Sequence, residues 1–401
     1  MEAAACVKLH EVTAGFCGSP SLERLRRRSS EKWRSYSPDV LPAFVAEMDF
    51  ELAPPIAAAL HAAIDVGDCG YACVRELPPS VCAYAARALG LSLDPNQVFA
   101  VPDVMAGVAQ ALHVLTPPGS AIVVNPPVYP PFFEVIRTSG REIAEVPLLV
   151  DDVGTWRIDV DGLERAFAAG ARGYLLCSPH NPVGRVWNAG ELRSIAALTK
   201  RYRVAVIADE IHAPLTLPGV SFRSFLACAD EAQASVALLS ASKAWNLAGL
   251  KCGAMVAGNA TVRTALAKRV KEIPTEIASR VGHLGVIASI AAFRDGFQWR
   301  DALCRHLDGN RLLLGNLLRE RLSLARWSPP EATYLAWIDC GGLGIGPDPA
   351  RHFLERGRVA LEPGHRFGAG GASFVRLNFG TSPAILTEII DRMAAAVHQR
   401  R

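Results

Sequence analysis

The chain has 401 residues, of which 50% are hydrophobic and 20% charged, and its formal net charge is +3 at pH 7. A chain of this length can bury a large core and is expected to form about two or three domains. The nearly balanced charge gives no indication of nucleic-acid binding, and no apolar run reaches the roughly 18 residues that a membrane-spanning helix needs. We therefore expect no nucleic-acid partner and no membrane association.

Two features precede the first predicted strand. The basic cluster at residues 24–28 is most simply a solvated N-terminal arm. After Pro102 the sequence takes a helical period, so the amides of Val104 and Met105 are expected at the positive end of a helix dipole, where a phosphate can bind. Any helix start offers such amides, so this signal is generic.

Two predicted strands lead into proline-rich turns. Residues 121–124 precede NPPVYPPFF, where Tyr129 stands among four prolines and can either stack on a planar cofactor or pack in the core. Residues 173–177 precede SPHNPVG, whose rigid turn can present Asn181 as a donor to a phenolic oxygen, although Asn-Pro turns are also common in loops. Neither turn identifies a ligand by itself.

A third apolar run, residues 204–208, is followed by Asp209-Glu210-Ile211-His212. It predicts a buried parallel strand with acids at its carboxyl end, which is where open α/β sheets bind ligands. A buried carboxylate is costly without a cation, and a protonated pyridine nitrogen is a suitable one. The alternative for Asp209 is a cap on the next helix.

A fourth apolar run, residues 236–239, is followed by Ser240-Ala241-Ser242, a small polar turn suited to a phosphate, and then by Lys243. Lysine forms an imine with an aldehyde cofactor, and burial or cationic neighbours lower its pKa and make it nucleophilic. Lys251 is a second cation suited to a phosphate. Taken alone, Lys243 could be a solvated loop residue.

The sequence changes character at about residue 300. A charged helix at 301–322 precedes strand patterns at 333–340, 359–368 and 373–380 and a closing helix at 386–399. We expect an α/β fold with a large domain at 50–295, built on a mostly parallel sheet flanked by helices. A small α+β domain at 296–401 would be completed by an N-terminal arm at 1–49, with the catalytic cleft between the two domains.

The ten cysteines are scattered without metal-ligand pairs, so we expect no metal site. The N-terminus shows no signal-peptide pattern, and we expect a cytoplasmic protein with reduced thiols. Cys177 and Cys252 flank the motif segments and are expected to be small buried packing residues.

Together these segments resemble the fold-type I pyridoxal-phosphate enzymes of the aminotransferase class I/II superfamily. More narrowly, the chain is similar to the carbon–sulfur β-lyases of the MalY/PatB group. The similarity covers nearly the whole chain through SSEKW, FVAEMDF, GYACV, PVYPPFF, SPHNPVGRVW, ADEIHAPL, SASKAWNLAGLKCG and RLNFGTS. It implies a seven-stranded sheet, pyridoxal 5'-phosphate as the cofactor, an amino-acid substrate and a homodimer with shared active sites.

The resemblance also implies roles around the cofactor ring. Lys243 would bind the cofactor as a Schiff base and move the proton on the substrate's Cα. Asp209 would keep the pyridine nitrogen protonated, and His212 and Asn181 would lie near the phenolic oxygen. Tyr129 would stack on the ring, and both Tyr129 and Asn181 would contact the substrate.

Further roles concern the phosphate and the substrate. The phosphate would be bound by two side chains and two amides: Ser240, Lys251, Val104 and Met105. Tyr71 of GYACV would reach this site from a neighbouring subunit and take part in catalysis. Arg376 would bind the substrate carboxylate through a bidentate fork. Without the resemblance we would place Arg376 on the exposed face of an edge strand.

Two departures from the group's pattern concern the substrate entrance. Glu47 stands where members often have aspartate, and Ala72-Cys73 follow GY where an aromatic or basic residue is frequent. These departures leave the cofactor expectation unchanged and leave the substrate open.

Three functions follow from these patterns. The first is α,β-elimination of cystathionine or another S-substituted L-cysteine to thiol, pyruvate and ammonia. The second is transamination, or a decarboxylating or oxidative reaction of a cysteine S-conjugate, because the same residues serve these paths. The third is a cofactor-binding regulator without turnover. It is disfavoured because such regulators usually carry an extra basic DNA-binding domain, whereas the enzyme motifs here begin by about residue 30.

Overall fold

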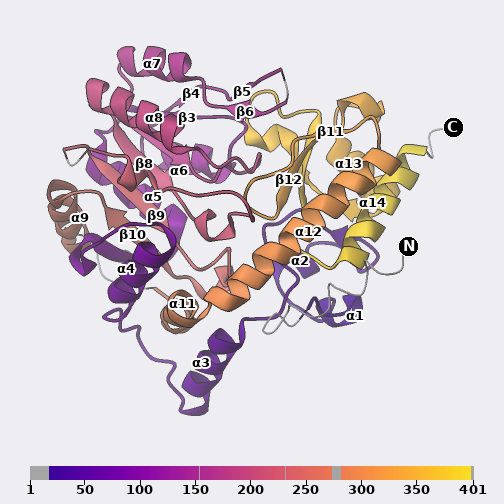
Figure 1. The fold of residues 1–401 in the computed structure, drawn as a ribbon, viewed down its shortest axis with the longest axis horizontal. Coiled ribbons are helices and arrows are strands. Elements are labelled where there is room, and N and C mark those ends of the chain that lie inside the picture. Colours follow the sequence, from indigo (N-terminus) through magenta and orange to yellow (C-terminus); the bar gives the residue numbers. More distant parts are fainter. Residues whose placement is uncertain (1–17, 153, 231, 273–280, 399–401) are drawn as a thin grey trace.

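The computed structural model describes residues 18–152, 154–230, 232–272 and 281–398 (Figure 1). A seven-stranded sheet forms the centre of the larger part of the molecule. In spatial order its strands are β2 (Val98–Val101), β10 (Gly253–Ala257), β9 (Ser235–Leu239), β8 (Ala205–Asp209), β7 (Gly173–Cys177), β3 (Ala121–Val124) and β4 (Glu142–Glu145). β10 is antiparallel to both of its neighbours, and the other neighbouring strands are parallel. The predicted mostly parallel α/β sheet is confirmed.

Helices cover both faces of this sheet because successive side chains of a strand point to opposite faces. In β7, Leu175 and Cys177 belong to one apolar cluster, and Tyr174 and Leu176 belong to another. The first cluster includes residues of α5 (Val104–Leu115), α6 (Pro131–Thr138) and α9 (Ala260–Glu272); the second includes residues of α7 (Val160–Ala168) and α8 (Ala189–Tyr202). Burial on both faces explains why these strands are continuous apolar runs in the sequence.

A second sheet of four antiparallel strands forms the smaller part. Its order is β11 (Arg326–Trp327), β12 (Leu335–Asp339), β15 (Phe374–Asn378) and β14 (Glu362–Pro363). The helices of this part are α12 (Phe297–Arg321), α13 (Pro349–Gly357) and α14 (Pro383–His398). In Figure 1 the long helix α12 runs from beside α11 toward α13 and so links the two parts. The smaller α+β part was also predicted.

The segment predicted as one strand at 359–368 is divided. β13 (Val359–Ala360) pairs with β1 (Leu41–Pro42) in a separate parallel ladder, β14 joins the four-stranded sheet, and the 3-10 helix η7 (Gly364–Phe367) follows. The prediction of one strand was therefore wrong. The domain boundaries at 49 and 295 stay predictions.

The prediction of a solvated arm at residues 24–28 holds for the exposed side chains of Arg24, Arg26 and Arg27 but not for the rest of the segment. Helices α1 (Leu22–Leu25) and α2 (Glu31–Arg34) lie here, and Leu25 is fully buried. Arg28 donates to the carbonyls of Met48 and Phe50, at 3.1 and 2.8 Å. Arg28 therefore ties the end of the basic run to residues 48–50.

Helices α3 (Pro54–Asp65) and α4 (Leu77–Ala88) pack on α11 (His283–Asp295), and α3 projects from the body in Figure 1. The remaining elements are short: the hairpin β5 (Leu149–Val150) and β6 (Trp156–Arg157), and the 3-10 helices η2 (Pro95–Gln97), η3 (Ala213–Leu215), η4 (Phe225–Ala227), η5 (Ala248–Leu250) and η6 (Gly341–Leu343). None of the helices in the described ranges is long and apolar enough to cross a membrane.

Candidate active site

A cavity of about 310 Å³ lies between the carboxyl ends of the large sheet's central strands and the smaller part. The carboxyl ends of parallel strands share one edge of a sheet. The cavity is therefore lined by residues from β7, from β8 and from the turns after β3, β7, β8 and β9. The predicted site residues that line it are Val104, Met105, Tyr129, Asn181, Asp209, His212, Lys243 and Arg376. Three predicted residues do not line it: Tyr71, Ser240 and Lys251.

Lys243 lies in the turn that follows β9, and its Nζ donates to the carbonyl of Ala46 at 3.1 Å. Burial and, to a smaller extent, the charge of Arg376 lower the pKa of Lys243 to about 8, although the charge of Asp209 acts in the opposite direction. A substantial fraction of this amine is therefore neutral near pH 8. A neutral amine is the nucleophilic form that a carbonyl compound requires.

Asp209 is the last residue of β8 and is only 4% exposed. Its Oδ1 accepts a hydrogen bond from the amide of Ile211 at 3.1 Å. Burial raises the pKa of Asp209 to about 6, against that hydrogen bond and the charge of Lys243. A cation placed beside this carboxylate would be bound strongly because it would offset the burial cost of the charge. A protonated pyridine nitrogen has the required charge.

Arg376 is 4% exposed on β15, which lies between β12 and β14. The alternative position on the exposed face of an edge strand was therefore wrong. One Nη atom donates to Oδ1 of Asn181 at 3.2 Å, and the other donates to the carbonyl of Phe44 at 2.8 Å. Its Nε has no hydrogen-bond partner among the described residues. A buried donor without a partner indicates a place for a ligand acceptor.

His212 carries a second buried atom, Nδ1, without a partner in the described part of the chain. Burial lowers the pKa of His212 to about 3, and the nearby charges of Lys243 and Arg376 act in the same direction. The imidazole is therefore neutral, and it can either donate or accept one hydrogen bond toward the cavity. Both orphan atoms fit the acceptor and donor groups of pyridoxal phosphate and of an amino acid.

The proposed phosphate-binding residues occupy two positions relative to the cavity. Val104 and Met105 begin α5 and line the cavity, and their first-turn amides lack acceptors within the helix. Lys251 lies next to this helix start, because its Nζ pairs with Oδ2 of the N-cap residue Asp103 at 3.0 Å. Ser240 does not line the cavity, and its hydroxyl donates to the carbonyl of Cys252 at 2.7 Å.

Tyr71 is 83% exposed in the loop between α3 and α4, and it does not line the cavity of its own chain. Two neighbouring apolar side chains are also exposed: Ile64 at 54% and Val66 at 79%. The structure thus exposes Ile64, Val66 and Tyr71 near the end of α3 and in the loop that follows it, rather than at the site.

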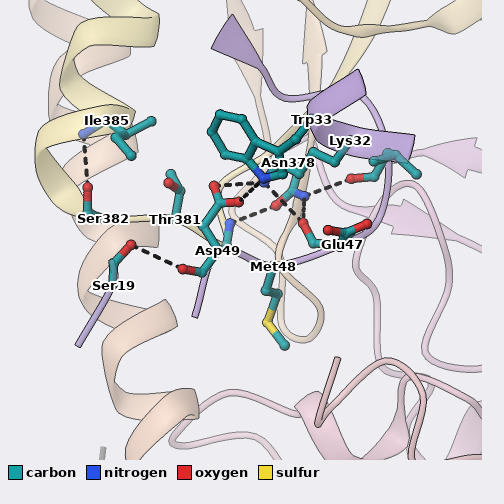
Figure 2. A network of polar contacts seen from close by, with 12 residues as sticks. Ser19, Lys32, Trp33, Glu47, Met48, Asp49, Asn378, Thr381, Ser382 and Ile385 are labelled. Carbon is teal, nitrogen blue, oxygen red and sulfur yellow. Dashed lines mark hydrogen bonds and ion pairs between the residues drawn. The ribbon is translucent and has the colours of Figure 1, made fainter. Parts of the chain in front are cut away.

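The sequence predictions missed a buried polar network that supports one wall of the cavity. Figure 2 shows Lys32 and Trp33 pointing toward Asp49. Lys32 Nζ lies 2.8 Å from Asp49 Oδ2, and the two side chains are 1% and 2% exposed. Trp33 Nε1 donates to Asp49 Oδ1 at 3.1 Å, while Asn378 and Lys32 both donate to the carbonyl of Glu47. The segment after β1 is therefore tied to both α2 and β15.

This network matters because the same segment contacts the reactive amine. The carbonyl of Ala46 accepts from Lys243 and also from the hydroxyl of Tyr334 at 2.9 Å. Glu47, expected at the entrance, does not line the cavity, and its carboxylate accepts from Ser30 at 2.6 Å. Lys32 and Trp33 lie in the motif SSEKW, and Asp49 lies in the motif AEMDF. The spacing within these motifs does not predict that the two segments contact each other.

The cavity also has lining residues that the sequence predictions did not single out. Those with charged side chains are Glu31, Glu362 and Arg366. The four-residue spacing of Glu362 and Arg366 in EPGHR is the signal that could have paired them. Cys177, expected to be a buried packing residue, is 4% exposed and also lines the cavity.

Comparison with known proteins gives three further findings. Residues 61–393 match the family described as aminotransferase class I and II. A relative from Mycobacterium tuberculosis is 44% identical, and the match covers 95% of this chain and 98% of the relative. The cystathionine beta-lyase of Corynebacterium glutamicum is 34% identical, and the match covers 94% of this chain and 99% of that enzyme. The crystal structure of cystalysin from Treponema denticola, which contains a pyridoxal 5'-phosphate cofactor, has a TM-score of 0.88 at 26% identity and covers 96% of this chain and 99% of its own.

Proposed function

The chain belongs to the aminotransferase class I and II family, and we propose that it is a pyridoxal-phosphate-dependent carbon–sulfur β-lyase acting on an S-substituted L-cysteine. One observation carries this proposal: a single cavity contains a lysine with a lowered pKa, a buried carboxylate at a strand end and a buried guanidinium with an unused donor. The full-length similarity to a cystathionine beta-lyase supports the choice of reaction.

The residues present fit the cofactor. Lys243 would bind its aldehyde carbon, Asp209 its ring nitrogen, and Asn181 and His212 its phenolic oxygen. Tyr129 would stack on the ring. The phosphate would lie at the start of α5, bound by the amides of Val104 and Met105, with Ser240 and Lys251 close by. When bound, pyridoxal phosphate supplies an electron sink for the charge that develops at the substrate's Cα.

The chain's own groups would position the substrate and move the proton. Arg376 would bind the α-carboxylate, using its free Nε and an Nη atom in a planar fork. Lys243 Nζ, released by the incoming amino group, would take the proton from Cα. Asp209 would remain ionised beside the ring nitrogen and favour charge withdrawal from Cα. Loss of the thiolate from Cβ, followed by hydrolysis, gives thiol, pyruvate and ammonia.

The test of the reaction is a product balance. The holoenzyme is incubated with S-substituted cysteines without added keto acid, and thiol, pyruvate and intact keto acid are measured. A β-lyase produces thiol and pyruvate in equal amounts. An intact keto acid that accumulates only when a second keto acid is supplied would replace the lyase by an aminotransferase. Carbon dioxide or peroxide matching substrate loss would identify the decarboxylating or oxidative alternative.

We also propose a homodimer in which Tyr71 completes the partner's site. The support is the exposure of Tyr71 together with that of Ile64 and Val66, because large exposed apolar surfaces mark interaction sites. Mixing inactive Tyr71→Ala and Lys243→Ala proteins should restore activity to roughly a quarter of the sites, as random pairing in a two-fold dimer predicts. No recovery despite proven subunit exchange would contradict the sharing of sites. The cytoplasmic location stays a prediction.

A further inference from the structure

The loop that carries Tyr71 has little burial in its first half. It connects α3 to α4, and every residue from 64 to 71 is exposed. A side chain built on Gly67 or Gly70 would meet no atom within 4 Å. Apolar packing therefore does not fix this half of the loop. Placing Tyr71 at one position has an entropic cost that other contacts must offset.

The second half of the loop is held by packing. Ala72 and Val74 are partly buried against the apolar cluster that includes Val81 and Tyr84 of α4. The carbonyl of Val74 also accepts from the amide of Leu77, the first residue of α4, at 3.1 Å. The loop thus has a fixed end at α4 and needs a second fixed point before Tyr71.

A contact with α11 supplies that second point. His283 is the first residue of α11, and its Nε2 lies 3.0 Å from Oδ2 of Asp68, three residues before Tyr71. The His283 side chain is 15% exposed and that of Asp68 is 54% exposed. Both ring nitrogens of His283 are buried, and neither makes an aligned hydrogen bond within the described ranges. The attraction between His283 and Asp68 is therefore mainly electrostatic.

The start of α11 is a rigid base for this contact. The amide of Gly282 donates to the carbonyl of Lys251 at 2.9 Å. A Cβ on Gly282 or Gly285 would lie only 2.3 or 2.2 Å from the carbonyl oxygen of Leu250. Glycine permits so close an approach of two backbones because it has no Cβ. His283, between these two glycines in the chain, is thus fixed against the end of η5.

We propose that His283 and Asp68 are a positioning pair, which holds the loop so that Tyr71 enters the partner's site. Neither residue lines the cavity of its own chain. Their effect on turnover would therefore appear in the site of the neighbouring subunit. This inference rests on the proposed sharing of sites, and it does not depend on which reaction the enzyme performs.

The first experiment asks which chain needs the pair. A heterodimer of Tyr71→Ala and Lys243→Ala chains, purified through two affinity tags, has one complete site, which takes Lys243 from the first chain and Tyr71 from the second. Adding His283→Gln to the Lys243→Ala chain should lower the recovered kcat about twofold to fivefold, the range of a partly exposed ion pair. Adding it to the Tyr71→Ala chain should leave the recovered kcat unchanged. Asp68→Asn should give the same pattern.

The second experiment measures the loop itself in the full-length holoenzyme. Arg75 is exposed and follows Tyr71 in the loop, and trypsin cleaves there in proportion to the population of the open loop. His283→Gln and Asp68→Asn should each speed cleavage after Arg75 about twofold to fivefold. The double variant should be cleaved no faster than either single variant, because both changes remove the same contact. Asp65→Asn, which removes an exposed carboxylate of α3, is the matched control and should be cleaved at the parental rate.

The two proposals fail differently. A loss of kcat that follows His283→Gln on the Tyr71→Ala chain, or no loss in either placement, would overturn the positioning role while the shared site stands. If the heterodimer without further changes has no activity, the sharing of sites is overturned. The cleavage rates then decide whether His283 and Asp68 hold the loop: faster cleavage in both single variants supports the pair, and parental rates or additive increases in the double variant overturn it.

Discussion

Replacing Lys32 by methionine should destabilise the protein and loosen the cavity wall. The Nζ of Lys32 lies 2.8 Å from Asp49 Oδ2, and both side chains are at most 2% exposed. In Lys32→Met, Asp49 would keep the hydrogen bond from Trp33 but lose its cation. An uncompensated buried charge of this kind costs about 3–5 kcal/mol.

This cost converts into a shift of the thermal midpoint. An unfolding entropy of about 2.1 cal/mol/K per residue over 401 residues gives roughly 840 cal/mol/K. If the chain unfolds as one unit, a loss of about 4 kcal/mol lowers Tm by about 5 °C. Because Ala46, which accepts from Lys243, lies in the segment that the network supports, kcat should fall as well.

The assay compares Tm and kcat in Lys32→Met, Asp49→Asn and the double variant. The double variant leaves no unpaired buried charge, so its loss of stability should be smaller than the sum of the two single losses by at least about 1 kcal/mol. Arg34→Gln, on the same helix but exposed, is the control and should leave Tm within about 1 °C. Additive losses in the double variant would refute the reasoning that the ion pair is what stabilises this wall.

Three further outcomes follow from the site. Asp209→Asn should keep Tm close to that of the parent but lower kcat by at least about tenfold, because an amide cannot balance the charge of a protonated ring nitrogen. A tenfold loss corresponds to ~1.4 kcal/mol of transition-state stabilisation. A kcat within about twofold of the parent value would exclude the proposed pairing of Asp209 with the ring nitrogen. Arg376→Lys should lower kcat/KM about tenfold or more, since an ammonium cannot reproduce the planar fork, and an unchanged value would show that the carboxylate binds elsewhere. Because the pKa of Lys243 is lowered to about 8, the rate at which the apoprotein captures pyridoxal phosphate should rise about tenfold per pH unit below pH 8 and level off above it. A rate that keeps rising to about pH 10, the range of an ordinary lysine, would contradict the lowered pKa.

The central strands and their site residues were predictable because a strand that is buried on both faces appears in the sequence as a continuous apolar run. β3 and β7 coincide with the apolar runs 121–124 and 173–177, and β8 and β9 differ from their runs by one residue at one or both ends. Once these strands are parallel, the residues that follow them converge at one edge of the sheet. Sequence alone therefore placed Asp209 and Lys243 near one another.

The rest of the site depends on contacts that no local pattern encodes. β14 has two residues and ends at Pro363, so it lacks the length of a recognisable strand. Lys32 and Asp49 are charged residues at fully buried positions, which a reading of hydrophobicity assigns to the surface. Glu31 and Arg366 meet at the cavity only because α2 and η7 are brought together by the β1–β13 ladder and the small sheet.

The most direct test of the account is to map the lysine that binds the cofactor. The purified holoenzyme is reduced with borohydride, digested and analysed by mass spectrometry for the pyridoxyl-phosphate adduct. The account predicts a single modified peptide with the adduct on Lys243, whose amine lines the cavity beside Asp209 and Arg376. An adduct on Lys251, or an enzyme that eliminates thiol without any bound pyridoxal phosphate, would contradict it.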